Sequence, residues 1–321
     1  MNVMQTLVKR EFWENRSLII APLVIAAFIV LSSVWGVVGI DHEGHNASIA
    51  SVETLDQIPD LDADERADLQ GAINLSDDRK QTGYALSILV FAAVLSALTC
   101  IVVFFYLIDC LYQERRDRSI LFWKSMPLSD TQVVLSKVLV AMVILPLGVL
   151  VLSAVTQLLV SMVYWIRFHD TIIGQIMPAF SLPAWLRAQW VALQIVIGGV
   201  LWYAPIAGYL LFMSAWARRL VFLWAVLPPL GLGVFEAITT HTTHVFEFLG
   251  QRFAGFIMAM DLDTHTFKRQ AGDVQMPSIH EAFDALSLKG MFLHQEMWLG
   301  LLFGAALVYA SIRLRRYRDE S

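Results

Sequence analysis

Four long stretches of this chain contain no Asp, Glu, Lys or Arg, and they constrain its fold more than any other feature. Each is 24 to 30 residues long, and together they comprise Ser17–Ile40, Gly83–Ile108, Val138–Ile166 and Ala188–Ala217. A helix needs about 20 residues to cross a hydrocarbon core of ~30 Å, and a charge at its centre costs roughly 2.5–3.5 kcal/mol. A surface helix of a soluble protein would show a polar stripe, which these stretches lack. The sequence therefore predicts an all-α polytopic membrane protein.

Two shorter apolar runs add a fifth and a sixth span. Leu220–Phe235 and Met297–Ile312 are charge-free, and each reaches a useful length by extending past a flanking acid, Glu236 or Glu296. The first span is too long for the 7–15 residue apolar region of a signal peptide. We therefore expect a membrane domain over residues 17–321 with a large outer loop before the last span, its spans lying at about 17–40, 83–108, 132–164, 188–216, 220–240 and 293–313.

The distribution of charge predicts the orientation of these spans. Six spans place both termini on one side, and that side carries 14 Lys and Arg against 8 Asp and Glu. The opposite side carries 9 against 20. Because Lys and Arg near span ends stay in the cytoplasm, we expect both termini to be cytoplasmic.

The first 16 residues differ from the spans. Val3, Leu7, Val8 and Phe12 follow helical spacing, and Glu11 interrupts their apolar face. This pattern is typical of an interfacial helix on the inner leaflet, although a simple basic anchor would also fit it. On the outer side, the apolar patch 246–260 would lie along the interface or re-enter the bilayer between other helices.

Motifs for chemistry are sparse. The sequence has no Gly-x-x-x-x-Gly-Lys-Ser/Thr loop, so no nucleotide cofactor is expected on this chain. The histidine pairs (His42 with His45, His241 with His244) are interpreted as solvated loop residues rather than a metal site, since a closed zinc site needs about four ligands. Gln157 and Gln194 lie within spans and are expected to bond neighbouring helices. Nothing in the sequence indicates nucleic-acid binding.

The most informative segment lies between the second and third spans. Charged residues at 114–118 precede an apolar run, Ile120–Trp123, and Pro127 ends any helix there. Ser129 and Gln132 then form a capping-box pattern that starts the next helix. A short amphipathic helix is predicted at about 113–126, covered by a protein partner or resting on membrane lipid.

This segment resembles the permease subunits of type-two ABC transporters, in which it forms the coupling helix that docks on the ATPase. The matching positions are Glu114, Arg115, Ser119, Ile120, Ser125, Pro127, Leu128, Ser129 and Lys137. The opening residues 7–13, Leu-Val-Lys-Arg-Glu-Phe-Trp, are similar to that family's N-terminal connecting helix.

The resemblance implies a permease, with ATP and Mg bound by a separate ABC ATPase subunit and a second permease chain beside it. It further implies an exporter in the bacterial cytoplasmic (inner) membrane, and it implies no substrate. The implied ATPase-coupling residues are Glu114, Arg115 and Arg118 as flanking charges, with Ile120, Leu121, Phe122 and Trp123 as docking anchors. An integral-membrane enzyme, or a sensor or assembly protein that uses the outer loops, is the alternative.

Overall fold

The computed structural model describes residues 3–39, 63–117, 128–176, 180–259 and 289–317, and within these ranges every regular element is a helix. Six of the described helical segments are long and apolar enough to cross a membrane, which confirms an all-α polytopic membrane protein. They are α2 (Ser17–Gly39), α5 (Asp77–Arg116), a composite third span (Asp130–Phe168), α10 (Leu182–Trp216), α11 (Val221–Thr239) and α15 (Gln295–Tyr317).

The third span is a composite of three segments. It consists of α7 (Asp130–Leu139), a π-helical turn η3 (Val140–Ile144) and α8 (Leu145–Phe168). Pro146 lies in the first turn of α8. Since proline donates no backbone hydrogen bond and clashes with the preceding turn, the widened turn lies where the regular helix is hardest to maintain. Pro22, Pro205 and the pair at 228–229 lie inside helices that continue past them.

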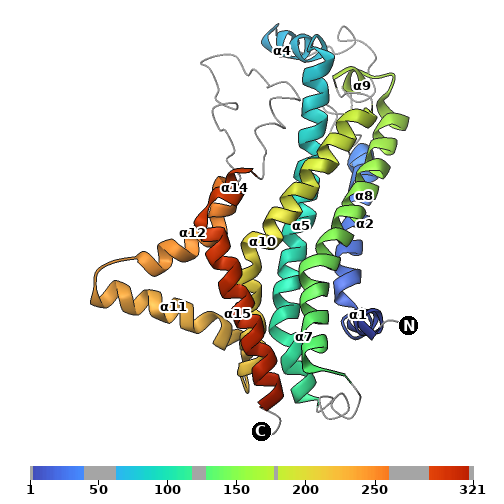
Figure 1. Ribbon diagram of the computed structural model, residues 1–321. Coiled ribbons are helices and arrows are strands. Elements are labelled where there is room, and N and C mark those ends of the chain that lie inside the picture. Colours follow the sequence, from blue (N-terminus) through green and yellow to red (C-terminus); the bar gives the residue numbers. More distant parts are fainter. Residues whose placement is uncertain (1–2, 40–62, 118–127, 177–179, 260–288, 318–321) are drawn as a thin grey trace.

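Apart from α11, the long helical segments form a bundle around α10, which packs along both α5 and α15 (Figure 1). Helix α2 packs against α8 and α5 on the other side of the bundle. The largest apolar core lies at the end of the bundle that carries both termini, and it includes Leu18, Leu107, Val134 and Leu211. We call this end of the molecule the termini end.

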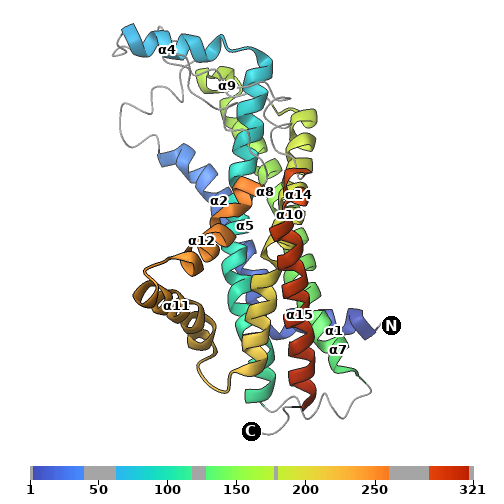
Figure 2. The same cartoon turned by 60° about the vertical axis from the view of Figure 1, so that its left-hand side comes forward.

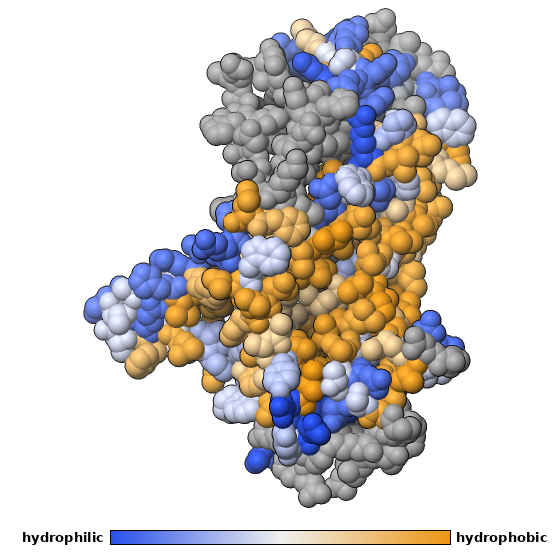
Figure 3. All heavy atoms as spheres, in the orientation of Figure 1, coloured by the Kyte–Doolittle hydropathy of each residue, from blue (hydrophilic) through white to orange (hydrophobic). Residues whose placement is uncertain are grey.

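The outer surface of the bundle is apolar over its middle. Figure 3 shows hydrophobic side chains covering the central part of the visible face, with hydrophilic residues toward its upper and lower ends. Large apolar side chains such as Phe28, Val151 and Leu302 are more than half exposed. In water such a surface would be costly, whereas against lipid tails it is the expected one.

Several elements extend beyond the predicted spans. Helix α5 has 40 residues, since its polar ends continue the helix past the charge-free run at both sides. At the end of the bundle opposite the termini lie α4 (Ala63–Ile73) and α9 (Ile172–Ile176). Lys80 Nζ donates to the backbone oxygens of Ile73, at 2.8 Å, and Gln175, at 2.9 Å. This lysine therefore joins both short helices to α5.

The N-terminal segment forms α1 (Val3–Glu14), which lies across the termini end of the bundle (Figure 2). It packs against α7, with Leu7 and Glu11 buried. The apolar face of this helix therefore contacts protein at these two positions.

Helices α11 and α12 (His244–Ala259) leave the bundle as a helical hairpin, which we call the arm (Figures 1 and 2). Leu220, in the left-handed conformation with φ of 50°, directly precedes α11, four residues after α10 ends. The Glu236 carboxylate accepts hydrogen bonds from the backbone N–H groups of His244, at 3.0 Å, and Val245, at 2.8 Å. An acid at a helix N-terminus is favourable, so Glu236 stabilises the tip of the arm.

Beyond its tip the arm returns to the bundle. Trp202 Nε1 donates to the Arg252 carbonyl at 3.0 Å, and the Tyr203 hydroxyl donates to that of Phe253 at 3.0 Å. Trp202 lies well away from both ends of α10 (Leu182–Trp216), so α12 contacts this span along its length rather than at an end. This placement favours the re-entrant interpretation of the apolar patch. Helix α14 (Lys289–Leu293) then leads into α15.

Candidate functional site

Charged side chains gather inside the termini end of the bundle, where a membrane protein would be expected to place few. Three acids and three cations from α1, α5, α7 and α15 contact one another there; this ionic cluster consists of Arg10, Glu11, Glu114, Asp130, Lys137 and Arg315. Glu11, Lys137 and Glu114 are only 0%, 1% and 5% exposed. Buried charges are costly unless they are paired and hydrogen-bonded, and each acid of the cluster contacts at least one cation. At its edge, Glu14 Oε1 lies 3.2 Å from Arg10 Nε.

Lys137 and Glu11 form the inner part of the cluster. Lys137 Nζ donates to Glu11 Oε1 at 2.8 Å and lies 3.1 Å from Glu114 Oε1. The Tyr106 hydroxyl donates to the other oxygen of Glu11 at 2.8 Å. Both oxygens of Glu11 are therefore satisfied by side chains from α5 and the third span, which places α1 against the bundle in one position.

Glu114, in the last turn of α5, joins three cations. Arg10 Nη2 donates to its Oε1 at 2.8 Å, and Arg315 Nη1 donates to its Oε2. Arg315 also donates from Nε to Asp130 Oδ1 at 3.1 Å. Charge-assisted hydrogen bonds of this kind are stronger than neutral ones. Glu114 therefore links the ends of α1, α5 and α15 with the start of the third span.

Local signals in the sequence place two of these residues. The Ser129 hydroxyl accepts from the Gln132 N–H and the Gln132 side chain accepts from the Ser129 N–H, both at 3.2 Å, which confirms the predicted capping box. The cap starts α7 at Asp130 and so positions Lys137 two turns later.

At the edge of the cluster, burial raises the pKa of the Glu14 carboxyl, although the nearby Arg10 guanidinium acts in the opposite direction.

Arg115 lies beside Glu114 but belongs to a different contact. Its Nη2 donates to the backbone oxygens of Ser214, at 2.6 Å, and Ala217, at 2.8 Å, at the end of α10. Cations near a helix C-terminus satisfy its unpaired carbonyls and complement its dipole. The last turn of α5 is thereby held to the end of α10.

The implied coupling residues are thus described in part. Glu114 and Arg115 contact other helices of this chain and hold the end of α5, which continues as one helix to Arg116. Arg118, Ile120, Leu121, Phe122 and Trp123 lie outside the described residues, as does most of the predicted helix 113–126. Docking of an ATPase on these residues stays a prediction.

Sequence reasoning missed most of the ionic cluster. Glu11 was visible only as a polar break in an apolar helix face, and Lys137 only as the last residue of the family-like pattern. Arg315 carried no signal beyond its place among other basic residues at the C-terminus. A buried acid on an amphipathic helix needs a cation, and Glu11 was the residue that could have prompted the search for one.

The polar groups elsewhere have other roles. Gln157 Nε2 donates to the Ile88 carbonyl at 3.2 Å and its oxygen accepts from Gln189 at 2.6 Å, which confirms the predicted bonds to neighbouring helices; the bond expected for Gln194 stays a prediction. Among the described residues, no three His, Cys, Asp or Glu side chains are grouped to hold a metal ion. His244 is exposed, and His42 and His45 lie outside the described residues.

Comparison with known proteins adds no identification. No protein-family model, curated protein or solved structure matches this chain.

Proposed function

We propose that this protein is the membrane-spanning permease subunit of an ATP-driven ABC transporter, and that it exports its substrate across the bacterial inner membrane. In this proposal a separate ATPase subunit binds ATP and Mg, docks on the cytoplasmic segment 118–127, and drives the permease. The termini end then faces the cytoplasm, and a second permease chain completes the transport path.

One observation supports this function best: three separate parts of the family-like pattern converge in the ionic cluster. The opening segment contributes Glu11 on α1, the residues after the second span contribute Glu114, and the last position of the pattern contributes Lys137. In the chain, Glu11 lies 126 positions from Lys137, and Arg10 lies 104 positions from Glu114. These contacts would explain why the three parts occur together in one chain: their side chains pair with one another in the folded protein.

The cluster also suggests how force on the segment would be transmitted. The segment 118–127 follows Glu114 and Arg115 and precedes Asp130 and Lys137, so both of its ends adjoin side chains held by the cluster or by α10. A displacement of the segment would therefore move α1, α10 and α15 together rather than bend a free loop. Packed elements joined by paired charges carry such coupling.

The proposal is tested by removing the docking anchors. Replacing Phe122 and Trp123 with Ala should remove about 2 kcal/mol or more of docking energy, a loss of roughly thirtyfold in affinity. The measurement is co-purification, from native membranes, of an ATPase with a nucleotide-binding P-loop, together with its ATP hydrolysis. The anchors lie outside the predicted spans, so the variant should still insert and fold.

Trp165→Ala is the matched control, since Trp165 is an exposed aromatic residue near the other end of the bundle; it should leave the complex intact. If the double variant retains the ATPase and its activity at the level of the unmodified protein, the segment is a connector on the lipid surface and the proposed function is wrong. Failure of any such ATPase to co-purify with the unmodified protein would also count against it.

A further inference from the structure

A pocket of about 640 Å³ lies between the arm and the bundle. Its wall is formed by α10, α11, α12 and α15, with Phe104 contributed by α5. Most of the lining is apolar, and the two charged residues in it are Arg252 and Glu296. Ligand pockets of proteins have this size and this combination of an apolar wall with a few polar groups.

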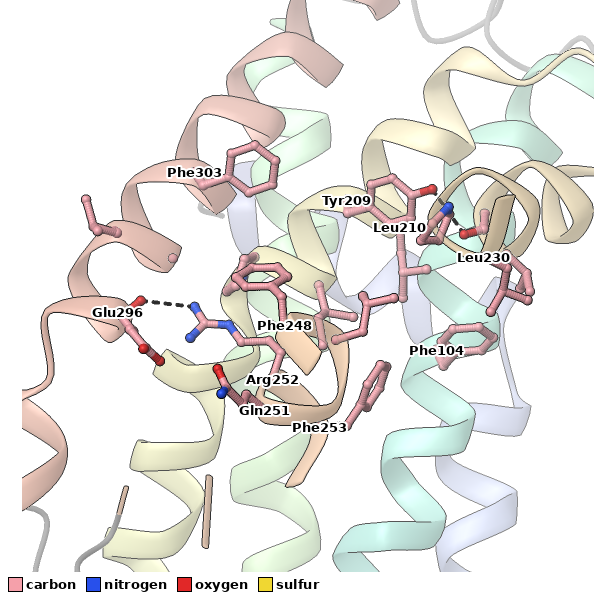
Figure 4. A pocket seen from close by; sticks show the side chains of 18 residues that line it. Phe104, Tyr209, Leu210, Leu230, Phe248, Gln251, Arg252, Phe253, Glu296 and Phe303 are labelled. Carbon is pink, nitrogen blue, oxygen red and sulfur yellow. Dashed lines mark hydrogen bonds between the residues drawn. The ribbon is translucent and has the colours of Figure 1, made fainter. Parts of the chain in front are cut away.

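The polar groups of the pocket are gathered at one end of it. In Figure 4, Arg252, Gln251 and Glu296 lie together on one side, and Phe104, Tyr209 and Leu230 lie on the other. The two ends therefore differ in chemistry: one presents a cation and an acid, and the other presents aromatic and aliphatic side chains. A molecule with a charged head and an apolar tail would match both.

Arg252 is 6% exposed and incompletely paired. Its Nη2 donates to the Glu296 carbonyl at 3.3 Å and its guanidinium lies 4.8 Å from the centre of the Trp202 ring. Its Nε has no hydrogen-bond partner among the described residues. A buried donor without a partner costs free energy, and a cation at membrane depth marks a functional site by default.

Gly300 creates the space that this guanidinium occupies. A Cβ atom added at Gly300 would lie 2.7 Å from Arg252 Cζ and still closer to its Nη2. Any larger residue at position 300 would displace the guanidinium. The chain therefore accommodates a buried arginine with a glycine on the facing helix.

The depth of Arg252 can be estimated along two spans. Its partner Trp202 lies 14 residues before the end of α10, about 21 Å at 1.5 Å per residue. Glu296 lies 17 residues before Arg313 on α15, about 26 Å. In a hydrocarbon core of ~30 Å, the charged end of the pocket is close to the leaflet opposite the termini. Tyr209, seven residues further along α10, lies about 10 Å nearer the termini end, just past the centre of such a core.

We propose that this pocket binds a zwitterionic phospholipid of the leaflet opposite the termini. Its phosphate accepts hydrogen bonds from the Arg252 guanidinium, its primary ammonium group lies against the Glu296 carboxylate, and an acyl chain follows the apolar wall toward Tyr209 and Phe104. The head group and the pocket then match in depth, direction and charge, since Arg252 and Glu296 together carry no net charge. The site needs no ATPase and stands independently of the proposed transport function.

The test uses the full-length protein in nanodiscs of equal parts phosphatidylethanolamine, phosphatidylglycerol and phosphatidylcholine. After extraction into mild detergent, mass spectrometry counts the phospholipids retained per chain. The unmodified protein should retain phosphatidylethanolamine preferentially, and Arg252→Gln should lower this retention about tenfold, since charge-assisted bonds to phosphate are strong. Glu296→Gln should retain phospholipid but lose the preference for the ethanolamine head group.

Two further variants separate a binding defect from a folding defect. Gly300→Ala keeps the charge and displaces the guanidinium, so it should lower retention in the same direction, while Arg252→Lys should preserve part of it. Arg167→Gln, at an exposed arginine, and Gly231→Ala, where a Cβ meets nothing within 4 Å, are the matched controls and should bind normally.

Equal retention by the unmodified protein, Arg252→Gln and Gly300→Ala would overturn the site. Preferential retention of phosphatidylglycerol would overturn the role of Glu296. If no phospholipid is retained and the Phe253→Cys variant forms cross-links between two chains, the pocket is an interface between copies instead.

Discussion

The ionic cluster and the arm differ in how completely their buried charges are paired. In the cluster every acid contacts at least one cation, and α1, α5, α7 and α15 converge on these contacts. In the arm Arg252 contacts a carbonyl and an aromatic ring, and its Nε is buried without a hydrogen-bond partner among the described residues. The cluster thus holds helices in one arrangement, whereas the arm leaves room and charge for another molecule.

Removal of one cation from the cluster should have the largest effect. Lys137→Met leaves Glu11 and Glu114 facing each other with one cation fewer, and breaking a buried pair in this way costs about 3–5 kcal/mol. The free energy of unfolding, measured by denaturant titration in mixed micelles, should fall by that amount. Lys9→Met, at an exposed position of α1, should change it little. A similar small change in both variants would show that the cluster is not a structural clamp.

A substitution where α10 crosses α15, between the two regions, should have an intermediate effect on the free energy of unfolding. A Cβ added at Gly208 of α10 would lie 2.6 Å from the backbone oxygen of Gly304 on α15. Backbone cannot give way as a side chain can, so Gly208→Ala should destabilise the protein by about 1–3 kcal/mol. Gly148→Ala on α8, where a Cβ meets nothing within 4 Å, is the control for helix propensity. An unchanged unfolding free energy for Gly208→Ala would mean that α10 and α15 approach less closely than described.

The smallest effect is expected where the arm meets the bundle. Trp202→Phe removes the 3.0 Å hydrogen bond to the Arg252 carbonyl and weakens the contact with its guanidinium, a loss of about 1 kcal/mol. Hydrogen–deuterium exchange should rise in α12 and remain unchanged in α1 and α7. The control is Trp190→Phe, an exposed tryptophan on the same helix. A uniform rise across all helices would contradict the separation of the two regions.

Much of the fold could be predicted from the sequence because the cost of placing charge in lipid is a local property. The first span was expected at 17–40 and α2 is Ser17–Gly39, and the fifth was expected at 220–240 and α11 is Val221–Thr239. The ends of α5 were less predictable. Polar residues such as Asp77 and Arg115 continue a helix that has already formed, since adding one more residue costs little.

The candidate sites were far less predictable. The termini end holds many Lys and Arg, and each could have paired with Glu11 as far as the sequence is concerned. Only the packing of the third span against α1 selects Lys137, 126 positions away. In the sequence Arg252 is one charged residue within the apolar patch 246–260. No local pattern pointed to a site there, because its neighbours Trp202 and Gly300 belong to other helices.

The sequence by itself determined how many helices are long and apolar enough to cross a membrane, where most of them lie and which end is basic, because these follow from the composition of contiguous residues. The tertiary structure decided which charges meet, and it turned Arg252 from a loop residue into one end of a pocket. Pairing and cavity formation depend on distances between helices remote in the chain, and no local pattern encodes those distances.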